Sequence, residues 1–176
     1  MTALSDIEQR WLDYAWGLVN CPEGHRRACE AAGGARPRAG AVDGNELRWP
    51  GYLGRNYAGI LCVGHINREM TPEAEARMAI PVRRRYAEQI LQSRRWIAEG
   101  RSPDSDRAYL EVVRTTHEAV VPLWPQWRDF AKVIEGQLQL DVTHIAWGNL
   151  AKCRQAIGGS PDALTRCASE TFLSET

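Results

Sequence analysis

The sequence predicts an α/β fold with a parallel central sheet. Two apolar runs beginning at Ile60 and Val142 each stop at a glycine followed by polar residues, as strands buried on both faces do. Amphipathic helical patterns lie between the two runs, and this alternation is typical of parallel strands joined by right-handed crossovers. We expect one domain over residues 1–176, because a chain of this length can bury a single core.

The composition is that of an ordinary globular protein, with 44% hydrophobic and 25% charged residues. The 22 basic residues equal the 22 acidic ones, so any attraction to nucleic acid must come from local clusters. The amino terminus lacks the pattern of a signal peptide, and no stretch reaches the ~18 apolar residues of a membrane span. The sequence therefore predicts a cytoplasmic protein that does not cross a membrane.

Capping and breaking residues predict the helices. Ser5 and Glu8 form a capping box, so a helix should begin there. A second helix should restart at Pro81 and stop at Gly100, and a third should cover about 104–119. Two more are predicted to begin at residues 125 and 160.

Two strands alone make a poor sheet, because they leave edges unpaired and cover few helices. We therefore expect a further short strand within residues 48–57. The polar end at residues 174–176 falls where another strand would be expected, which predicts that the domain is incomplete at its carboxyl end.

Candidate site residues follow the two strong strands. Parallel sheets bind ligands just beyond the carboxyl ends of their strands, so we expect chemistry at His65, Asn67 and Asn149. Gly64 suits a tight turn beside a ligand because it has no Cβ. The structural alternatives are an Asx turn for Asn149 and helix-capping turn residues for His65 and Asn67.

The predicted strand that begins at Ile60 ends at Gly64, which is followed by a polar turn. After the predicted strand that begins at Val142, the segment from Asn149 to Arg154 has the sequence Asn-x-x-Lys-Cys-Arg. Together they resemble the uracil-DNA glycosylase superfamily, and the second segment is similar to its iron-sulfur branch. The resemblance covers roughly residues 57–170. It implies a three-layer α/β/α fold. It also implies a hydrolase of base excision repair that binds DNA, flips out uracil or a damaged base and cuts its N-glycosidic bond.

The resemblance also implies roles for individual residues. The Asn149 amide would read the base edge through its acceptor and donors, while His65 and Asn67 would orient water or stabilise the departing base. The base would also be bound by Gly64, Trp147 and Lys152. Trp49 and Trp147 are the tryptophans that remain candidates for stacking on a base, since Trp11, Trp16, Trp96 and Trp127 lie on helical stripes and are expected in the core.

The chain departs from the superfamily pattern in three places. No proline follows Gly64 directly or within the next few residues, residues 68–85 contain no aromatic side chain, and a late histidine motif is expected beyond the printed end. An alternative function is therefore a non-catalytic module that binds a nucleobase or nucleic acid. A third is a different α/β enzyme that acts on a small metabolite.

The chain has an odd number of cysteines, five, and no secretion signal, which argues against a disulfide framework. Cys62 lies inside the first strand and is expected in the core. The other four, Cys21, Cys29, Cys153 and Cys167, could bind a [4Fe-4S] cluster. Seven residues separate the first two, whereas the related branch has Cys-x-x-Cys, so unmetallated thiols and no cofactor are the expectation.

Arginines supply the local positive charge. Arg83 and Arg84 lie in an arginine-rich helix and Arg154 follows the second strand, so we expect these three to contact DNA phosphates. The alternative is a solvated helix face on which Glu88 and Glu99 balance the charge.

Overall fold

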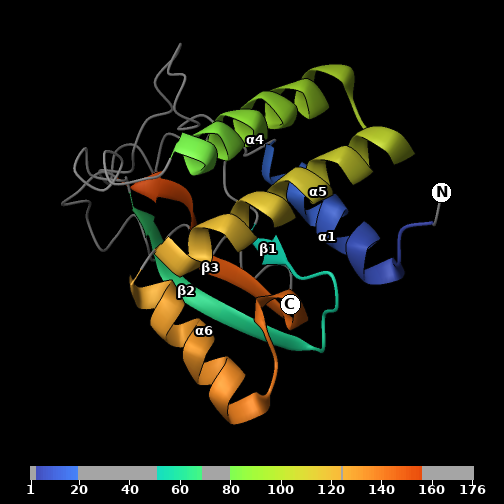
Figure 1. Cartoon of the computed structure of the whole chain (residues 1–176). Coiled ribbons are helices and arrows are strands. Elements are labelled where there is room, and N and C mark those ends of the chain that lie inside the picture. Colours follow the sequence, from blue (N-terminus) through green and yellow to red (C-terminus); the bar gives the residue numbers. More distant parts are fainter. Residues whose placement is uncertain (1–2, 20–50, 69–79, 124, 156–176) are drawn as a thin grey trace.

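The computed structural model describes residues 3–19, 51–68, 80–123 and 125–155 (Figure 1). The elements in chain order are α1 (Asp6–Val19), β1 (Tyr52–Leu53), β2 (Ile60–Arg68), α4 (Ile80–Glu99), α5 (Pro103–Val120), the 3₁₀ turn η1 (Val121–Leu123), α6 (Pro125–Leu138), the 3₁₀ turn η2 (Val142–His144) and β3 (Ile145–Gln155). Helices and a small sheet are combined, so the α/β class is confirmed. The helix predicted at residue 160 lies outside the described residues.

The predicted helix boundaries are confirmed where the capping chemistry is visible. The Ser5 backbone N–H and hydroxyl both donate to Glu8, at 2.8 and 2.9 Å, at the start of α1. Gly100 follows the last residue of α4 with φ +78°, a left-handed conformation that ends a helix. Ser102 caps α5 and Pro103 occupies its first position.

The sheet of the described residues has the strand order β1-β3-β2. β2 and β3 are parallel, as predicted, whereas β1 is antiparallel to β3. β1 confirms the short strand expected within residues 48–57, but it makes the sheet mixed rather than wholly parallel. The second strand begins at Ile145 and not at Val142, because Asp141 accepts a hydrogen bond from the Thr143 N–H and closes a 3₁₀ turn there.

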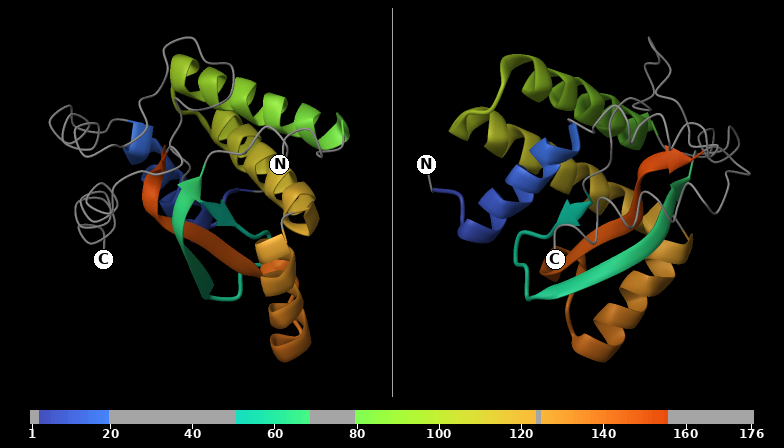
Figure 2. Two further views of the ribbon diagram at one scale, coloured as in Figure 1. Left: turned by 90° about the vertical axis from the view of Figure 1, so that its left-hand side faces the viewer. Right: turned by 180° about the vertical axis from the view of Figure 1, so that it is seen from behind.

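Among the described residues, two hydrophobic cores hold these elements together. The helical core joins α1, α4 and α5 through six buried residues: Leu12, Ala15, Trp96, Tyr109, Leu110 and Val113. The sheet core lies between α6 and the strands, where Ile134 contacts Cys62 and Ile145. Figures 1 and 2 show the helical layer of α4 and α5 above the sheet and α6 against β2 and β3. Cys62 is buried, as predicted from the sequence.

α5 and α6 cover the same face of the sheet. Tyr52, Cys62 and Trp147 form one row across the three strands. The Tyr52 ring stacks on His117 of α5, and Trp147 contacts Phe130 of α6. Leu61 and Val63 alternate to the other face and are about half exposed, at 52% and 47%.

No helix in the described part of the chain is both long enough and apolar enough to span a membrane.

Candidate functional site

The two segments that carry the candidate site residues lie side by side as the parallel strands β2 and β3. Gly64 is in register with Asn149, and Asn67 is in register with Arg154. Sequence positions more than 80 residues apart are therefore neighbours in one ladder. The expectation that the two strands are adjacent and parallel is confirmed.

The predicted ends of these strands are wrong. β2 continues past Gly64 to Arg68, and β3 continues past Trp147 to Gln155. His65, Asn67 and Asn149 thus belong to the strands and do not follow them. The physical reason is the ladder itself, since each strand supplies backbone partners that let the other remain extended beyond the glycine.

The ladder changes register between Ile66 and Asn67. Ile66 pairs with Ala151 and Asn67 pairs with Arg154, so Lys152 and Cys153 are extra residues in β3. An irregularity of this kind bends a strand and redirects its side chains, and such features are common beside active sites. The side chains of His65, Asn67, Asn149, Lys152 and Arg154 lie outside the described part of the structure, and their roles stay predictions.

The Trp147 side chain is described and takes part in packing. Its ring meets Phe130 edge to face, with centroids 5.1 Å apart and an interplanar angle of 85°. It also packs against the sheet core. Trp147 therefore connects the strand that carries Asn149 to α6. Trp49, the other candidate for stacking, lies outside the described residues.

The loop before β2 holds β3 from its other edge. A Cβ on Gly51 would lie 2.3 Å from the Trp147 carbonyl oxygen, and one on Gly54 would lie 2.1 Å from that of Thr143. These backbone oxygens lie too close for a side chain at either position, and Gly51 also has φ +101°, a conformation that favours glycine. The Gly54 N–H donates to the Ile145 carbonyl at 2.9 Å. The backbone that leads to Asn149 is thus fixed on both sides.

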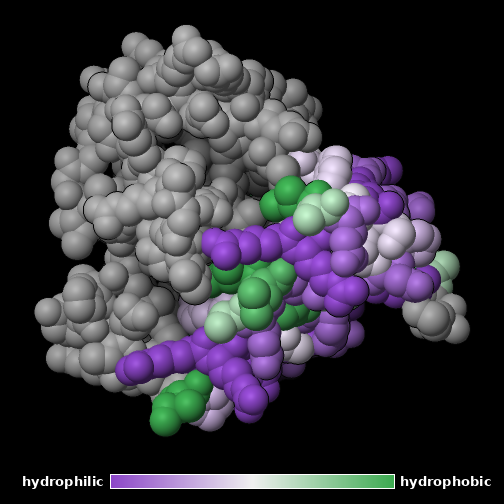
Figure 3. All heavy atoms as spheres, turned by 90° about the horizontal axis from the view of Figure 1, so that it is seen from above, coloured by the Kyte–Doolittle hydropathy of each residue, from purple (hydrophilic) through white to green (hydrophobic). Residues whose placement is uncertain are grey.

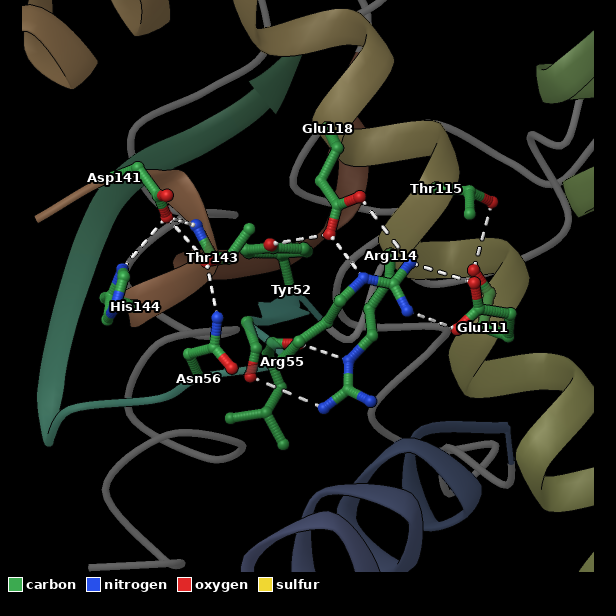
Figure 4. Close-up of polar contacts among 12 residues, drawn as sticks. Tyr52, Arg55, Asn56, Glu111, Arg114, Thr115, Glu118, Asp141, Thr143 and His144 are labelled. Atoms are coloured by element: carbon green, nitrogen blue, oxygen red, sulfur yellow. Dashed lines mark hydrogen bonds and ion pairs between the residues drawn. The ribbon is translucent and has the colours of Figure 1, made fainter. Parts of the chain in front are cut away.

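A polar network next to this loop was missed by sequence reasoning. Arg55 binds both carboxylate oxygens of Glu111, at 2.6 and 2.8 Å, and its Nε donates to Glu118 at 3.1 Å (Figure 4). The Tyr52 hydroxyl donates to the same Glu118 at 3.2 Å. These contacts attach β1 and its loop to α5.

The junction between α5 and β1 with its loop also contains a buried guanidinium, that of Arg114, and a buried imidazole, that of His117. Arg114 donates to the Leu53 carbonyl at 2.8 Å and to Glu8 of α1 at 2.8 Å. His117 lies parallel to Tyr52, with ring centroids 4.0 Å apart. The signal in the sequence was the apolar stripe of α5, in which His117 occupies the position between Val113 and Val120.

Burial sets the protonation states at this junction. It lowers the pKa of His117 to about 3, so the imidazole is neutral near pH 7. Burial and the neighbouring Glu118 carboxylate raise the pKa of Tyr52, so the phenol keeps its proton. Neutral, stacked and hydrogen-bonded groups of this kind stabilise the fold, and we assign this network to positioning the sheet.

The described residues contain no group of three or more His, Cys, Asp or Glu side chains able to hold a metal ion. Burial raises the pKa of the Cys62 thiol, which disfavours the thiolate that metals bind. Cys21, Cys29 and Cys167 lie outside the described residues, and for Cys153 the described part is its backbone in β3. The cluster hypothesis therefore stays a prediction.

Arg83 and Arg84 lie in the first turns of α4. Arg84 is exposed and its Nε lies 3.9 Å from Glu88, one turn further along. Arg95 and Glu99 form a similar pair at 2.9 Å near the other end of the helix. Arg84 and Arg95 are thus each balanced by a glutamate on the exposed face of α4. The expected contacts of Arg83 and Arg84 with DNA stay a prediction.

Comparisons with known proteins add no relative to this picture. No family model, no curated protein and no solved structure matches the chain.

Proposed function

We propose that this protein is a DNA N-glycosylase of the uracil-DNA glycosylase kind, a hydrolase that flips out uracil or a damaged base and excises it. The observation that supports the proposal best is the parallel pairing of β2 with β3, with Gly64 in register with Asn149. This pairing brings together the two segments on which the resemblance depends. The three-layer α/β/α arrangement is part of the same proposal.

The proposed chemistry uses groups from both strands. The Asn149 amide would pair with the imide N–H and a carbonyl of a flipped uracil. His65 or Asn67 would orient a water molecule whose oxygen bonds to C1′ as the C1′–N bond breaks. The base leaves with the bonding electrons and takes a proton, and donors near it stabilise its charge. Gly64, Trp147 and Lys152 would complete the base pocket.

The proposed DNA surface combines α4 with the end of β3. The first turns of α4 and the carboxyl ends of β2 and β3 lie on the same side of the molecule (Figures 1 and 2). Arg83 and Arg84 would contact phosphates from the helix, and Arg154 would do so from the strand. Affinity for DNA should then fall as salt increases, because each phosphate contact releases counterions.

A second candidate function is a non-catalytic module that binds a nucleobase or nucleic acid. One observation favours it: β2 remains a strand for four residues beyond Gly64 and pairs with β3 on both sides of the register change. His65 and Asn67 are therefore held in an extended ladder, whereas a water molecule is more readily enclosed by a turn.

The two candidates differ in whether the DNA strand becomes alkali-sensitive. Labelled DNA containing one uracil, single-stranded or duplex, is incubated with the protein and then treated with alkali to cleave abasic sites. We expect cleavage by the wild-type chain and its loss in Asn149→Asp, because the carboxylate repels the uracil carbonyl. Asn56→Ala is the matched control, since Asn56 is an exposed amide near the start of β3, hydrogen-bonded to Thr143.

The Asn149→Asp preparation also reveals any contaminating glycosylase, because contamination would cleave in both samples. Binding of the same DNA is followed by fluorescence anisotropy. Binding without cleavage would support the module, and a chain that neither cleaves nor binds would contradict both candidates.

A further inference from the structure

A shallow apolar groove runs between α4 and α5, away from the candidate site. Leu91, with 64% of its surface exposed, lies in this groove with Ala108 and Val112 of α5. Glu88 and Arg95 line the same groove on either side of Leu91 along α4. Figure 3 looks down on the side of the molecule that carries α4, where apolar patches are surrounded by hydrophilic residues.

The residues along this side of α4 form a single stripe. Spacings of four, three, four and four residues place them on one helix face: Arg84, Glu88, Leu91, Arg95 and Glu99. All four charged side chains are more than half exposed, between 55% and 82%. We call these five residues the α4 stripe. Along the helix their side chains are positive, negative, apolar, positive and negative.

The α4 stripe is complementary to itself when reversed. A second α4 that runs antiparallel, with a two-fold axis beside Leu91, places Glu88 opposite Arg95 of the other copy. Leu91 then lies near the groove of the second copy. Symmetric dimers require this property, because one surface must match itself across the axis. We propose that the α4–α5 face binds a second copy of this chain in an antiparallel, two-fold dimer.

The charge balance also selects this occupant over a nucleic acid. At the groove, Glu88 and Arg95 balance each other on either side of Leu91, so this part of the stripe offers a polyanion no net attraction. The pairs within each helix, Arg84 with Glu88 and Arg95 with Glu99, persist in the dimer, where Glu88 and Arg95 each gain a second partner. Arg84 lies beyond the groove, about 10 Å along the helix from Leu91, and stays available to the proposed DNA surface.

Light scattering coupled to size-exclusion chromatography tests the dimer. The wild-type chain should have twice the mass of one chain, with a monomer appearing on dilution. Leu91→Asp should give the monomer mass, because it puts a carboxylate at the centre of the interface. Val133→Asp is the matched control, since Val133 is a 57% exposed apolar residue on α6, and it should remain dimeric.

Charge reversal provides a sharper test. Glu88→Arg alone opposes two arginines across the axis, and Arg95→Glu alone opposes two glutamates, so each should weaken the dimer by ~10-fold or more. An equimolar mixture of the two variants restores opposite charges at both contacts and should regain the dimer mass. Circular dichroism checks that each variant is folded.

The proposal is overturned if the wild-type chain is a monomer at the highest concentration reached, or if Leu91→Asp stays dimeric. It is also overturned if the mixture of charge variants dimerises no better than either one alone. These measurements use no DNA and change no residue of β2, β3 or the proposed DNA surface, so they succeed or fail independently of the proposed glycosylase activity.

Discussion

The helical core and the sheet core differ in how completely they are packed. In the helical core, the rings of Trp96 and Tyr109 stack at 4.0 Å, and the Trp96 Nε1–H donates to Asp106 at 2.7 Å. Among the described residues the sheet core has three buried members against six in the helical core, and Phe130 beside it is 37% exposed. In the described part of the chain the helices therefore have the larger buried core, while β2 and β3, which carry the candidate site, pack on the smaller one. Less strongly packed parts of a protein commonly carry its binding sites, since these must adapt to a ligand.

Leu110→Ala should have the largest effect on stability. Leu110 is 2% exposed and surrounded by other members of the helical core, so its removal leaves a cavity that cannot collapse. We expect the free energy of unfolding to fall by about 4 kcal/mol, measured by urea denaturation. Leu138→Ala is the control: Leu138 is 50% exposed, and the change should cost within about 0.5 kcal/mol.

Ile134→Ala makes a comparable truncation in the sheet core. Ile134 is 5% exposed, but among the described residues its core cluster has fewer buried members than that of Leu110, so the site can relax. We expect a loss of about 2 kcal/mol in the same urea experiment. A loss equal to that of Leu110→Ala would show that the two cores are equally well packed and would remove the basis of the comparison.

His117, which lies at the junction between α5 and β1, should make the free energy of unfolding depend on pH. Its pKa is about 3 in the folded chain and near 6.5 when unfolded, so the unfolded chain binds the extra proton between these values. The free energy of unfolding should therefore fall by about 1.4 kcal/mol per pH unit as the pH drops from about 6 towards 3.

His117→Gln removes this titration while keeping a polar side chain of similar length. Urea denaturation of the variant between pH 4 and 7 should give a flatter profile than that of the wild-type chain. Equal slopes for the two proteins would show that other groups cause the acid sensitivity.

Local signals predicted the helices well. The Ser5–Glu8 capping box, Gly100 and Pro125 act within one helical turn, so their effects can be read from neighbouring residues. The parallel pairing of β2 with β3 was also predictable, because the apolar runs and the helices between them limit the topology.

Features that depend on distant partners could not be read in the same way. The extension of β2 to Arg68 and the antiparallel direction of β1 both depend on the ladder with β3. Tyr52 gave no sign that it would stack on His117, which is 65 residues away in the sequence. The candidate site was predicted as a pairing of two segments, and that pairing is the part that the described backbone bears out.

Gly51 and Gly54 carry a consequence for evolution. Because the β3 backbone lies against both of them, any side chain at either position would displace the strand that leads to Asn149. A divergent homologue that retains this sheet should therefore retain a glycine pair three residues apart, just ahead of the strand that contains Gly64. This glycine spacing gives a way to recognise distant homologues whose overall sequence identity is low.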